Sequence, residues 1–337
     1  MSNRRISRIG ITAAVLAAVV AVGTACSSND STAADDTAGV GDVTLTVGDQ
    51  VKGTQSLLEA SGELKNLPYK IKWATFEAGP PLLEAAAADK IDFGGTGDVP
   101  PVFAQSAGSP LKIVAVTSVR KAGDYLLVPE GSSIKSVAEL KGKKVAFTKG
   151  SSSNGLVLAA LKQAGLKPSD ITETFLSPSE GLAAFTSGQV DAWAVWNPYA
   201  AVAKSKGKPR VLADGTNLTS KQTYYLASKG ALADSAKDEA LKDLVGRIAR
   251  AQRWAATHED QWVPIFSKLT TLPEQVAKAT FESSSGSLVP IDDAVIGKQQ
   301  RLIDLFADAK VIPNHPKAAD YFDARYNAAV ESEGAGS

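Results

Sequence analysis

Apolar and polar positions follow the same order at two places in the chain, residues 83–98 and residues 182–197. In each place an alanine-rich helical segment ends in a short turn, a mostly apolar strand follows, and a polar residue opens the next helix. Upstream, the apolar strands at residues 45–47 and 145–147 each lead into a helix through glycine and hydroxyl residues. Two copies of this pattern predict two α/β halves, although strand-then-helix alternation is common enough for chance likeness to remain an alternative.

The chain length supports two domains, because 337 residues exceed what one hydrophobic core usually serves. A strand expected at residues 223–227 follows the second half, and the helices after it carry apolar faces that need a partner, as at residues 241–248. We therefore predict a discontinuous first lobe of residues 43–127 plus 223–337 and a second lobe of residues 128–222. Each lobe is expected to be a doubly wound α/β domain, with a hinge and a central ligand cleft between the two.

The N-terminus has the pattern of an export signal. Three arginines precede an apolar run at residues 9–22 and small residues follow it, so residues 1–25 are expected to be a signal peptide rather than a membrane-spanning helix. Cys26 stands directly after these small residues and is the only cysteine, which excludes a disulfide within the chain. Residues 26–42 are rich in small and polar residues and are expected to be a disordered tether.

Charge and composition exclude several classes of function. Lysine plus arginine equals aspartate plus glutamate at 36 each; residues 1–25 hold three arginines and no acid, so the rest of the chain has 33 against 36. Such a chain has no global field that attracts nucleic acid. His258 and His315 are isolated and no Gly-x-Ser-x-Gly sequence occurs, so we expect no bound metal, no cofactor and no enzymatic activity.

Helix starts are the candidate anion site. Helix N-termini present N–H groups without intrahelical partners, and four of them facing one cleft would favour a small anion. The segment at residues 91–101 ends a buried strand in glycines and opens a helix that begins with two prolines. Residues 149–155 add glycines and serine hydroxyls at another helix start, which an ordinary serine cap explains as well. The four starts contain no arginine, which disfavours a dianionic phosphate.

Several segments resemble the aliphatic-sulfonate-binding proteins of ABC importers, and the likeness covers essentially the whole exported region. They are residues 91–101, 144–155, 176–178 and 190–199. The related taurine and nitrate binders share the general plan. The resemblance implies a two-lobed type II periplasmic-binding-protein fold, no cofactor, and a monomer that closes on a sulfonate and delivers it to a membrane permease. Cys26 resembles the lipidated cysteine of bacterial lipoproteins, which implies an extracytoplasmic protein anchored to the cell membrane; an unmodified cysteine is the alternative.

On this resemblance, the anionic head is expected to meet the four helix starts, and the tail to lie beside two aromatic residues, Trp196 and Tyr199. The expected ligand-binding residues are Gly53, Thr54, Thr96, Gly97, Asp98, Ser151, Ser152, Ser153, Trp196, Asn197 and Tyr199. Alternation along the strand places Trp193 and Trp196 on opposite faces, which favours Trp196 as the wall of the pocket and Trp193 as core.

Two residues depart from the family pattern. Asn197 stands where aspartate is expected, which puts a preference for an amine-bearing ligand such as taurine in doubt, and Glu77 could alter specificity or lie outside the site. Arg120, Lys52 and Lys149 stay open as further contacts of the anion. Taurine, nitrate or another small anion are the alternatives to a sulfonate, and a sensory ligand-binding module is the alternative to transport. The thiamine-pyrimidine synthases have a similar fold but rely on clustered histidine and cysteine, which disfavours them here.

Overall fold

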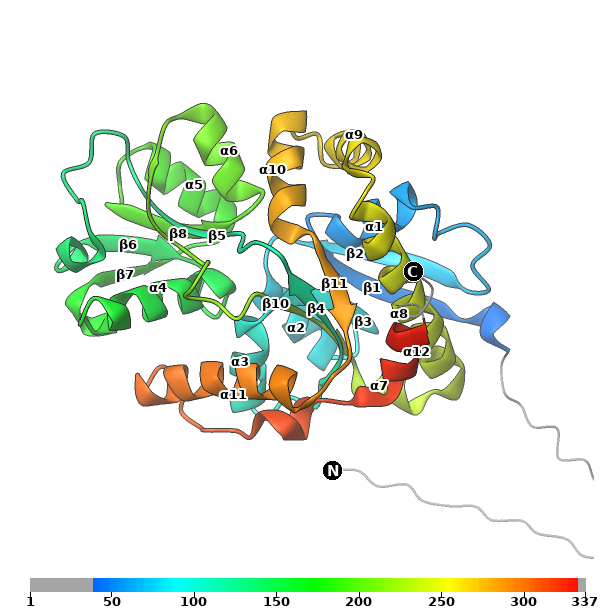
Figure 1. The fold of residues 1–337 in the computed structure, drawn as a ribbon. Helices are drawn as coiled ribbons and strands as arrows, with labels where there is room; N and C mark the ends of the chain where they lie inside the picture. The colour runs from blue at the N-terminus through cyan, green and yellow to red at the C-terminus, as the bar shows by residue number, and fades with distance from the viewer. Residues whose placement is uncertain (1–38, 333–337) are drawn as a thin grey trace, which may run out of the picture. The chain divides into compact units, whose positions relative to one another are not determined.

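The computed structural model of the protein describes residues 39–332, which belong to a single unit from Thr37 to Ser337. Two β-sheets with flanking helices make up this region (Figure 1). The predicted signal peptide, Cys26 and most of the predicted tether lie outside the described residues. Within residues 39–332, no helix is long and apolar enough to cross a membrane.

The first sheet has six strands in the order β11-β4-β10-β3-β1-β2. They are β1 (Thr44–Gln50), β2 (Lys70–Phe76), β3 (Phe93–Gly97), β4 (Lys112–Val119), β10 (Gln222–Ala227) and β11 (Gly286–Val289). β1 runs parallel to β2 and β3, whereas β10 runs antiparallel to β3 and β4. The strand expected to return late in the chain therefore lies inside the sheet, where it joins β3 to β4.

The second sheet has five strands in the order β7-β6-β8-β5-β9. They are β5 (Asp124–Val128), β6 (Lys144–Phe147), β7 (Thr172–Phe175), β8 (Ala192–Trp196) and β9 (Arg210–Asp214). β6 runs parallel to β7 and β8, and β5 runs antiparallel to β8 and β9. The predicted end of the first lobe at residue 127 thus falls inside a strand of the second sheet, and the division into lobes stays a prediction.

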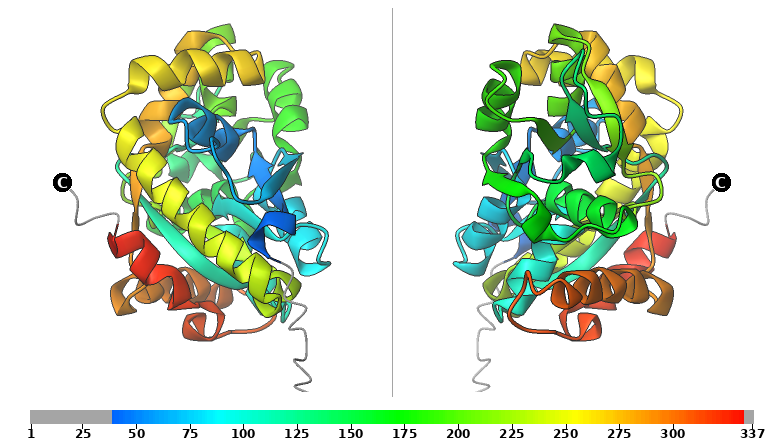
Figure 2. Two further views of the ribbon diagram at one scale, coloured as in Figure 1. Left: turned by 90° about the vertical axis from the view of Figure 1, so that its right-hand side faces the viewer. Right: turned by 90° about the vertical axis from the view of Figure 1, so that its left-hand side faces the viewer.

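Helices cover both sheets. They are α1 (Gly53–Ala60), α2 (Gly79–Ala87), α3 (Val99–Ser106), α4 (Ser152–Gln163), α5 (Pro178–Thr186), α6 (Tyr199–Lys206), α7 (Lys229–Ala233), α8 (Ser235–Ala255), α9 (Glu259–Thr270), α10 (Glu274–Ser284), α11 (Asp293–Asp308) and α12 (Asn327–Ser332). Figure 1 shows α4, α5 and α6 around the second sheet. Figure 2 shows the long helix α8 crossing in front of the first sheet.

The two predicted copies have the same element order in the structure. The first copy forms α2, β3 and α3, and the second forms α5, β8 and α6. Prolines open α2, α3 and α5, where a missing N–H removes no intrahelical hydrogen bond. Ser177 and Glu180 form a capping box at the start of α5. The predicted α/β fold class is confirmed.

The core of the first sheet depends on α8. Leu241, Leu244 and Ile248 are fully buried on one face of this helix, in the same cluster as Leu45 of β1 and Phe93 of β3. Their spacing predicted this apolar face. Each such side chain contributes about 2 kcal/mol through burial, so the late helix is a major part of the first sheet's stability.

Ending the chain at Gly215 should destroy the first sheet, because β10 and β11 are the strands that flank β4. The side chains of α8 that cover β1 would be lost with them. Urea unfolding followed by circular dichroism should show the cooperative transition of the full chain disappear. A chain that ends at Ser332 is the control, since it keeps every described helix and strand. A cooperative transition at the full chain's midpoint in the shorter chain would contradict this account.

Candidate functional site

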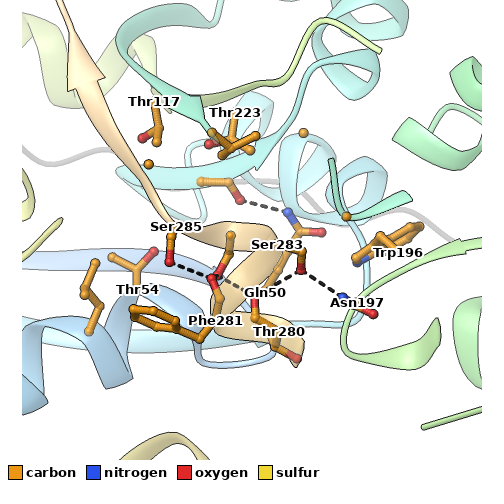
Figure 3. A pocket seen from close by; sticks show the side chains of 18 of the residues that line it. Gln50, Thr54, Thr117, Trp196, Asn197, Thr223, Thr280, Phe281, Ser283 and Ser285 are labelled. Carbon is orange, nitrogen blue, oxygen red and sulfur yellow. Dashed lines mark hydrogen bonds between the residues drawn. The ribbon is translucent and has the colours of Figure 1, made fainter. Parts of the chain in front are cut away.

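A cavity of about 290 Å³ collects residues from the ends of strands in both sheets. Figure 3 shows Trp196 and Asn197 on one side of it and Thr54 and Phe281 on the other. Eight of the eleven predicted ligand-binding residues line this cavity: Gly53, Thr54, Thr96, Gly97, Asp98, Ser152, Trp196 and Asn197. The structure therefore places most of the residues predicted from the helix starts in one cavity.

Ser151 and Ser153 are not part of the cavity lining. Ser151 Oγ donates to Thr148 O at 2.6 Å, so its own proton is used, and Ser153 Oγ donates to Ser151 Oγ at 2.7 Å. Both side chains are buried. These hydroxyls stabilise the turn that precedes α4. In the first turn of α4, only the backbone of these two serines is left to contact a ligand.

Tyr199 also lies behind the lining, next to Glu77. The Tyr199 hydroxyl donates to Glu77 O at 3.4 Å, and its ring meets the Trp196 ring edge to face with 6.0 Å between centroids. The Glu77 carboxylate accepts a hydrogen bond from Ser179 Oγ at 3.0 Å in the first turn of α5. Tyr199 therefore supports Trp196, and Glu77 links β2 to the helices of the second sheet.

The side chain of Asp49 caps the start of α1. Asp49 accepts hydrogen bonds from Thr54 N at 3.0 Å and from Gln55 N at 2.8 Å. Burial raises the pKa of Asp49 from 3.8 to about 6, against the lowering effect of these donors. Two of the N–H groups expected to face an anion thus already have a carboxylate partner.

Asn197 precedes the N-cap residue of α6, Pro198, and its side chain binds the first turn of this helix. Asn197 Oδ1 accepts from Ala201 N at 3.1 Å. Its Nδ2 donates to Ala279 O at 3.0 Å and to Ser283 Oγ at 2.8 Å, both on α10. Asn197 therefore ties the end of β8 to α10, across 82 residues of sequence.

Two further carboxylates lie beside the starts of α3 and α4, and each accepts a hydrogen bond from a serine hydroxyl. Asp98 accepts from Ser220 Oγ at 2.6 Å, and the prolines that follow it in α3 have no N–H to offer. Asp124 accepts from Ser152 Oγ at 2.6 Å at the start of α4. A Cβ added to Gly97 would lie 3.3 Å from Ser152 Cβ, so glycine keeps the end of β3 against this helix start.

The cavity holds more acid than base. Among the described residues, its charged lining consists of Asp49, Asp98 and Asp124 against Arg120 and Lys221. Burial raises the pKa of Asp98, and burial followed by the charge of Asp98 raises that of Asp124 from 3.8 to about 7 despite the Ser152 hydrogen bond. A protonated Asp124 would lower the negative charge that an anionic ligand meets.

The two lysines left open by the sequence point elsewhere. Lys52 Nζ donates to Leu269 O at 2.8 Å, and Lys149 Nζ lies over the ring of Phe175, 5.4 Å from its centroid. Neither is in the cavity lining, whereas Arg120 is.

Sequence reasoning missed Asp124 and Gln222. Asp124 is an isolated acid at the first position of β5, and its contact with Ser152 spans 28 residues. Gln222 Oε1 accepts from Tyr224 Oη at 2.7 Å, and its Nε2 is buried with no hydrogen-bond partner among the described residues. The signal that could have found Gln222 is an amide at the start of a strand that is otherwise apolar and aromatic.

The described residues contain no group of three or more His, Cys, Asp or Glu that could hold a metal ion. Neither of the two histidines lines the cavity. His258 Nδ1 lies 2.7 Å from Trp254 O, and His315 Nε2 lies 2.7 Å from Asp304 Oδ1. Each histidine therefore has a local structural partner.

Two α/β sheets that share one ligand-sized cavity at their strand ends define a two-lobed solute-binding protein. The family model described as NMT1/THI5 like matches residues 78–261. The chain is 39% identical over 274 residues to an Escherichia coli (strain K12) protein named for aliphatic sulfonate binding, covering 80% of this chain and 85% of that one. The chain belongs to this NMT1/THI5-like family of binding proteins.

Solved structures agree with this assignment. The alkanesulfonate-binding protein SsuA from Xanthomonas axonopodis pv. citri, bound to MOPS, has a TM-score of 0.77 and 34% identity, covering 83% of this chain and 98% of that one. The periplasmic aliphatic sulphonate binding protein SsuA from Escherichia coli has a TM-score of 0.72 and 38% identity, covering 82% and 91%. The fold predicted from the resemblance is confirmed, and these relatives are binding proteins.

Asp124 should make stability depend on pH. The carboxyl of Asp124 ionises near pH 4 in the unfolded chain and near pH 7 in the folded chain. Between these values only the folded chain holds the proton, so the free energy of unfolding falls as the pH rises through this window. Asp124→Asn keeps an acceptor for Ser152 and stays neutral. Relative to Asp124→Asn, the wild-type protein should lose up to about 1.4 kcal/mol per pH unit between pH 5 and 7.

Urea unfolding of both proteins at pH 5 and pH 8 measures this difference. Glu84→Gln, an exposed carboxylate on α2 outside the cavity, is the matched control. The same difference between wild type and Asp124→Asn at both pH values would show that Asp124 does not hold the proton.

Proposed function

We propose that the protein captures an aliphatic sulfonate in this cavity by closing two lobes around it and delivers it to an ABC permease. The observation that carries the proposal is that both cleft segments, residues 91–101 and 190–199, contribute to one cavity. The sulfonate-binding names of the relatives support the substrate class. In this proposal each lobe is built on one sheet, the chain crosses before β5 and returns before β10, and the protein acts as a monomer.

The start of α4 is the proposed seat of the sulfonate head. The starts of α1 and α6 have internal caps and α3 begins with prolines, whereas the N-cap residue of α4, Ser151, makes no side-chain cap hydrogen bond and leaves first-turn N–H groups for a ligand. Ser152 lies at the same point with its hydroxyl donating to Asp124, and Gly97 allows the end of β3 to approach it. The other proposed contacts surround this seat: Gly53, Thr54, Thr96, Asp98, Ser151, Ser153 and Asn197, with Trp196 beside the tail and Tyr199 behind it.

The cavity can bind a monoanion only if the negative charge of its three aspartates is compensated. Arg120 and Lys221 supply positive charge at the lining, and a proton on Asp124 removes one negative charge next to Ser152. We propose that Asp124 is protonated in the complex. A dianion would require more cationic groups than these.

Taurine is the second candidate ligand. The carboxylates of Asp98 and Asp124, which line the cavity, are able to accept hydrogen bonds from an ammonium group, which an alkanesulfonate does not carry. The taurine-binding periplasmic protein of Escherichia coli is 29% identical over 138 residues, 41% of this chain and 42% of that protein. Asn197, which is engaged with α10, gives no charge for this purpose.

The proposed place of action is outside the cytoplasm, at the cell membrane. Residues 1–25 have the pattern of a signal peptide, and Cys26 follows them as the only cysteine of the chain. A lipid on Cys26 and the tether after it would hold the protein near its permease.

Affinity should rise with the length of the ligand's tail. Each methylene buried beside Trp196 is worth about 0.8 kcal/mol, or about fourfold in the dissociation constant, from methane- to ethane- to propanesulfonate. Trp196→Ala should flatten this slope and change methanesulfonate binding less. Calorimetry on both proteins measures it, with Trp73→Ala, a partly buried tryptophan outside the lining, as the matched control.

An unchanged slope in Trp196→Ala would remove Trp196 from the tail site. If nitrate competes better than every sulfonate, the substrate class is wrong; if taurine binds more tightly than ethanesulfonate, the second candidate replaces the first.

Cys26→Ser should release the protein from the membrane, because no other thiol can carry the lipid. Fractionation of cells that produce the full chain should move the protein from the membrane pellet to the soluble fraction or the medium. Ser28→Ala is the control and should stay in the pellet. Unchanged pelleting of Cys26→Ser would refute the lipid anchor.

A further inference from the structure

The cavity extends from the α4 start to a cluster of apolar side chains on the helices of the first sheet. These residues, which we name the aromatic annex, are Leu57, Ala255, Ala256, Trp262, Phe266 and Phe281. They come from α1, from the end of α8, from α9 and from α10. The annex belongs to the same cavity as Asp124, Ser152 and Trp196, so one ligand can reach both ends.

Three rings give the annex a rigid wall. Trp262 stacks on Phe266 with 4.6 Å between centroids and 17° between planes, and it meets Phe281 at 5.4 Å. All three residues are buried. Aromatic walls of this kind favour flat apolar groups, because ring pairs add to the free energy of burial.

The annex also contains an unmet donor. Trp262 Nε1 is buried and has no hydrogen-bond partner among the described residues, and neither does Oε1 of Gln252 on the adjoining turn of α8. Buried polar groups are normally paired, because an unpaired one carries its full desolvation penalty. A ligand that reaches this end of the cavity can form hydrogen bonds with Trp262 Nε1 and Gln252 Oε1, for which the described residues provide no partner.

Asn197 connects the annex to the strand end that carries Trp196. Its two hydrogen bonds hold α10 at Ala279 and Ser283, on either side of Phe281. The same residue caps α6 beside Trp196. Side-chain hydrogen bonds of Asn197 therefore connect the Trp196 side of the cavity to α10, which carries Phe281.

We infer that the annex receives the tail of the ligand and that the preferred substrates are sulfonates with an aromatic or similarly bulky apolar tail. This inference rests on the proposed sulfonate function and names its substrate class. A cavity of about 290 Å³ is close to the size that takes a drug-sized ligand, whereas a one-carbon sulfonate would fill only the end at Ser152. The wall at Trp196 contacts the first atoms of the tail, and the annex receives the rest.

Calorimetry with methanesulfonate, benzenesulfonate and 2-naphthalenesulfonate on the full protein tests the inference. Benzenesulfonate should bind at least about tenfold more tightly than methanesulfonate, because its ring adds buried apolar surface. Ala256→Phe fills the annex from an exposed position and should remove about tenfold or more of this advantage while changing methanesulfonate binding less than about threefold. Leu57→Ala, which removes wall atoms, should weaken the two aromatic ligands and leave methanesulfonate unchanged.

Ala183→Phe places the same side chain on an exposed position of α5, outside the cavity, and should change none of the three affinities. If methanesulfonate binds but the aromatic sulfonates bind no more tightly, the annex inference is wrong and the sulfonate function stands. Equal weakening of all three ligands by Ala256→Phe also overturns the inference. If no sulfonate binds to the wild-type protein, the proposed function fails and the inference fails with it.

Discussion

Buried negative charge is the constraint on which the cavity depends. Asp49, Asp98 and Asp124 each accept hydrogen bonds that hold a helix start or a loop in place, and each has its pKa raised by burial. Removing these carboxylates would free N–H and O–H donors for an anion but would also release the elements that shape the cavity. An anionic ligand must therefore bind among carboxylates, which is possible only where a proton or a cation compensates their charge.

This constraint explains how the site differs from four equivalent helix starts. Asp49 and Asn197 use the donors at α1 and α6, and prolines remove donors from α3, which leaves the first turn of α4. Asn197 then gains a structural role, because it holds α10 and the aromatic rings near the second sheet. In the proposed function the head and the tail of the ligand contact different elements, so selectivity for the tail can change without altering the site of the head.

Local pattern predicted the order of the elements, the late strand of the first sheet and the gathering of most candidate residues in one cavity. Periodicity and turn chemistry set these features within short segments, as the two copies ending at Asp98 and Asn197 show. The partners of the polar groups could not be predicted. Asp98 meets Ser220 across 122 residues and Asn197 meets α10 across 82, and such pairs arise only from packing of the whole chain. Strand pairing places residues 124–127 in the second sheet, which local pattern does not determine, and the lobe boundary stays a prediction.

Proton uptake on binding tests the central claim most directly, that a sulfonate enters this acidic cavity next to a protonated Asp124. Calorimetric titration with ethanesulfonate at pH 8, in two buffers that differ in ionisation enthalpy, measures it. The account predicts binding with uptake of about one proton at pH 8 and none at pH 5, where Asp124 already holds its proton. Binding of equal strength at both pH values without proton uptake would contradict it.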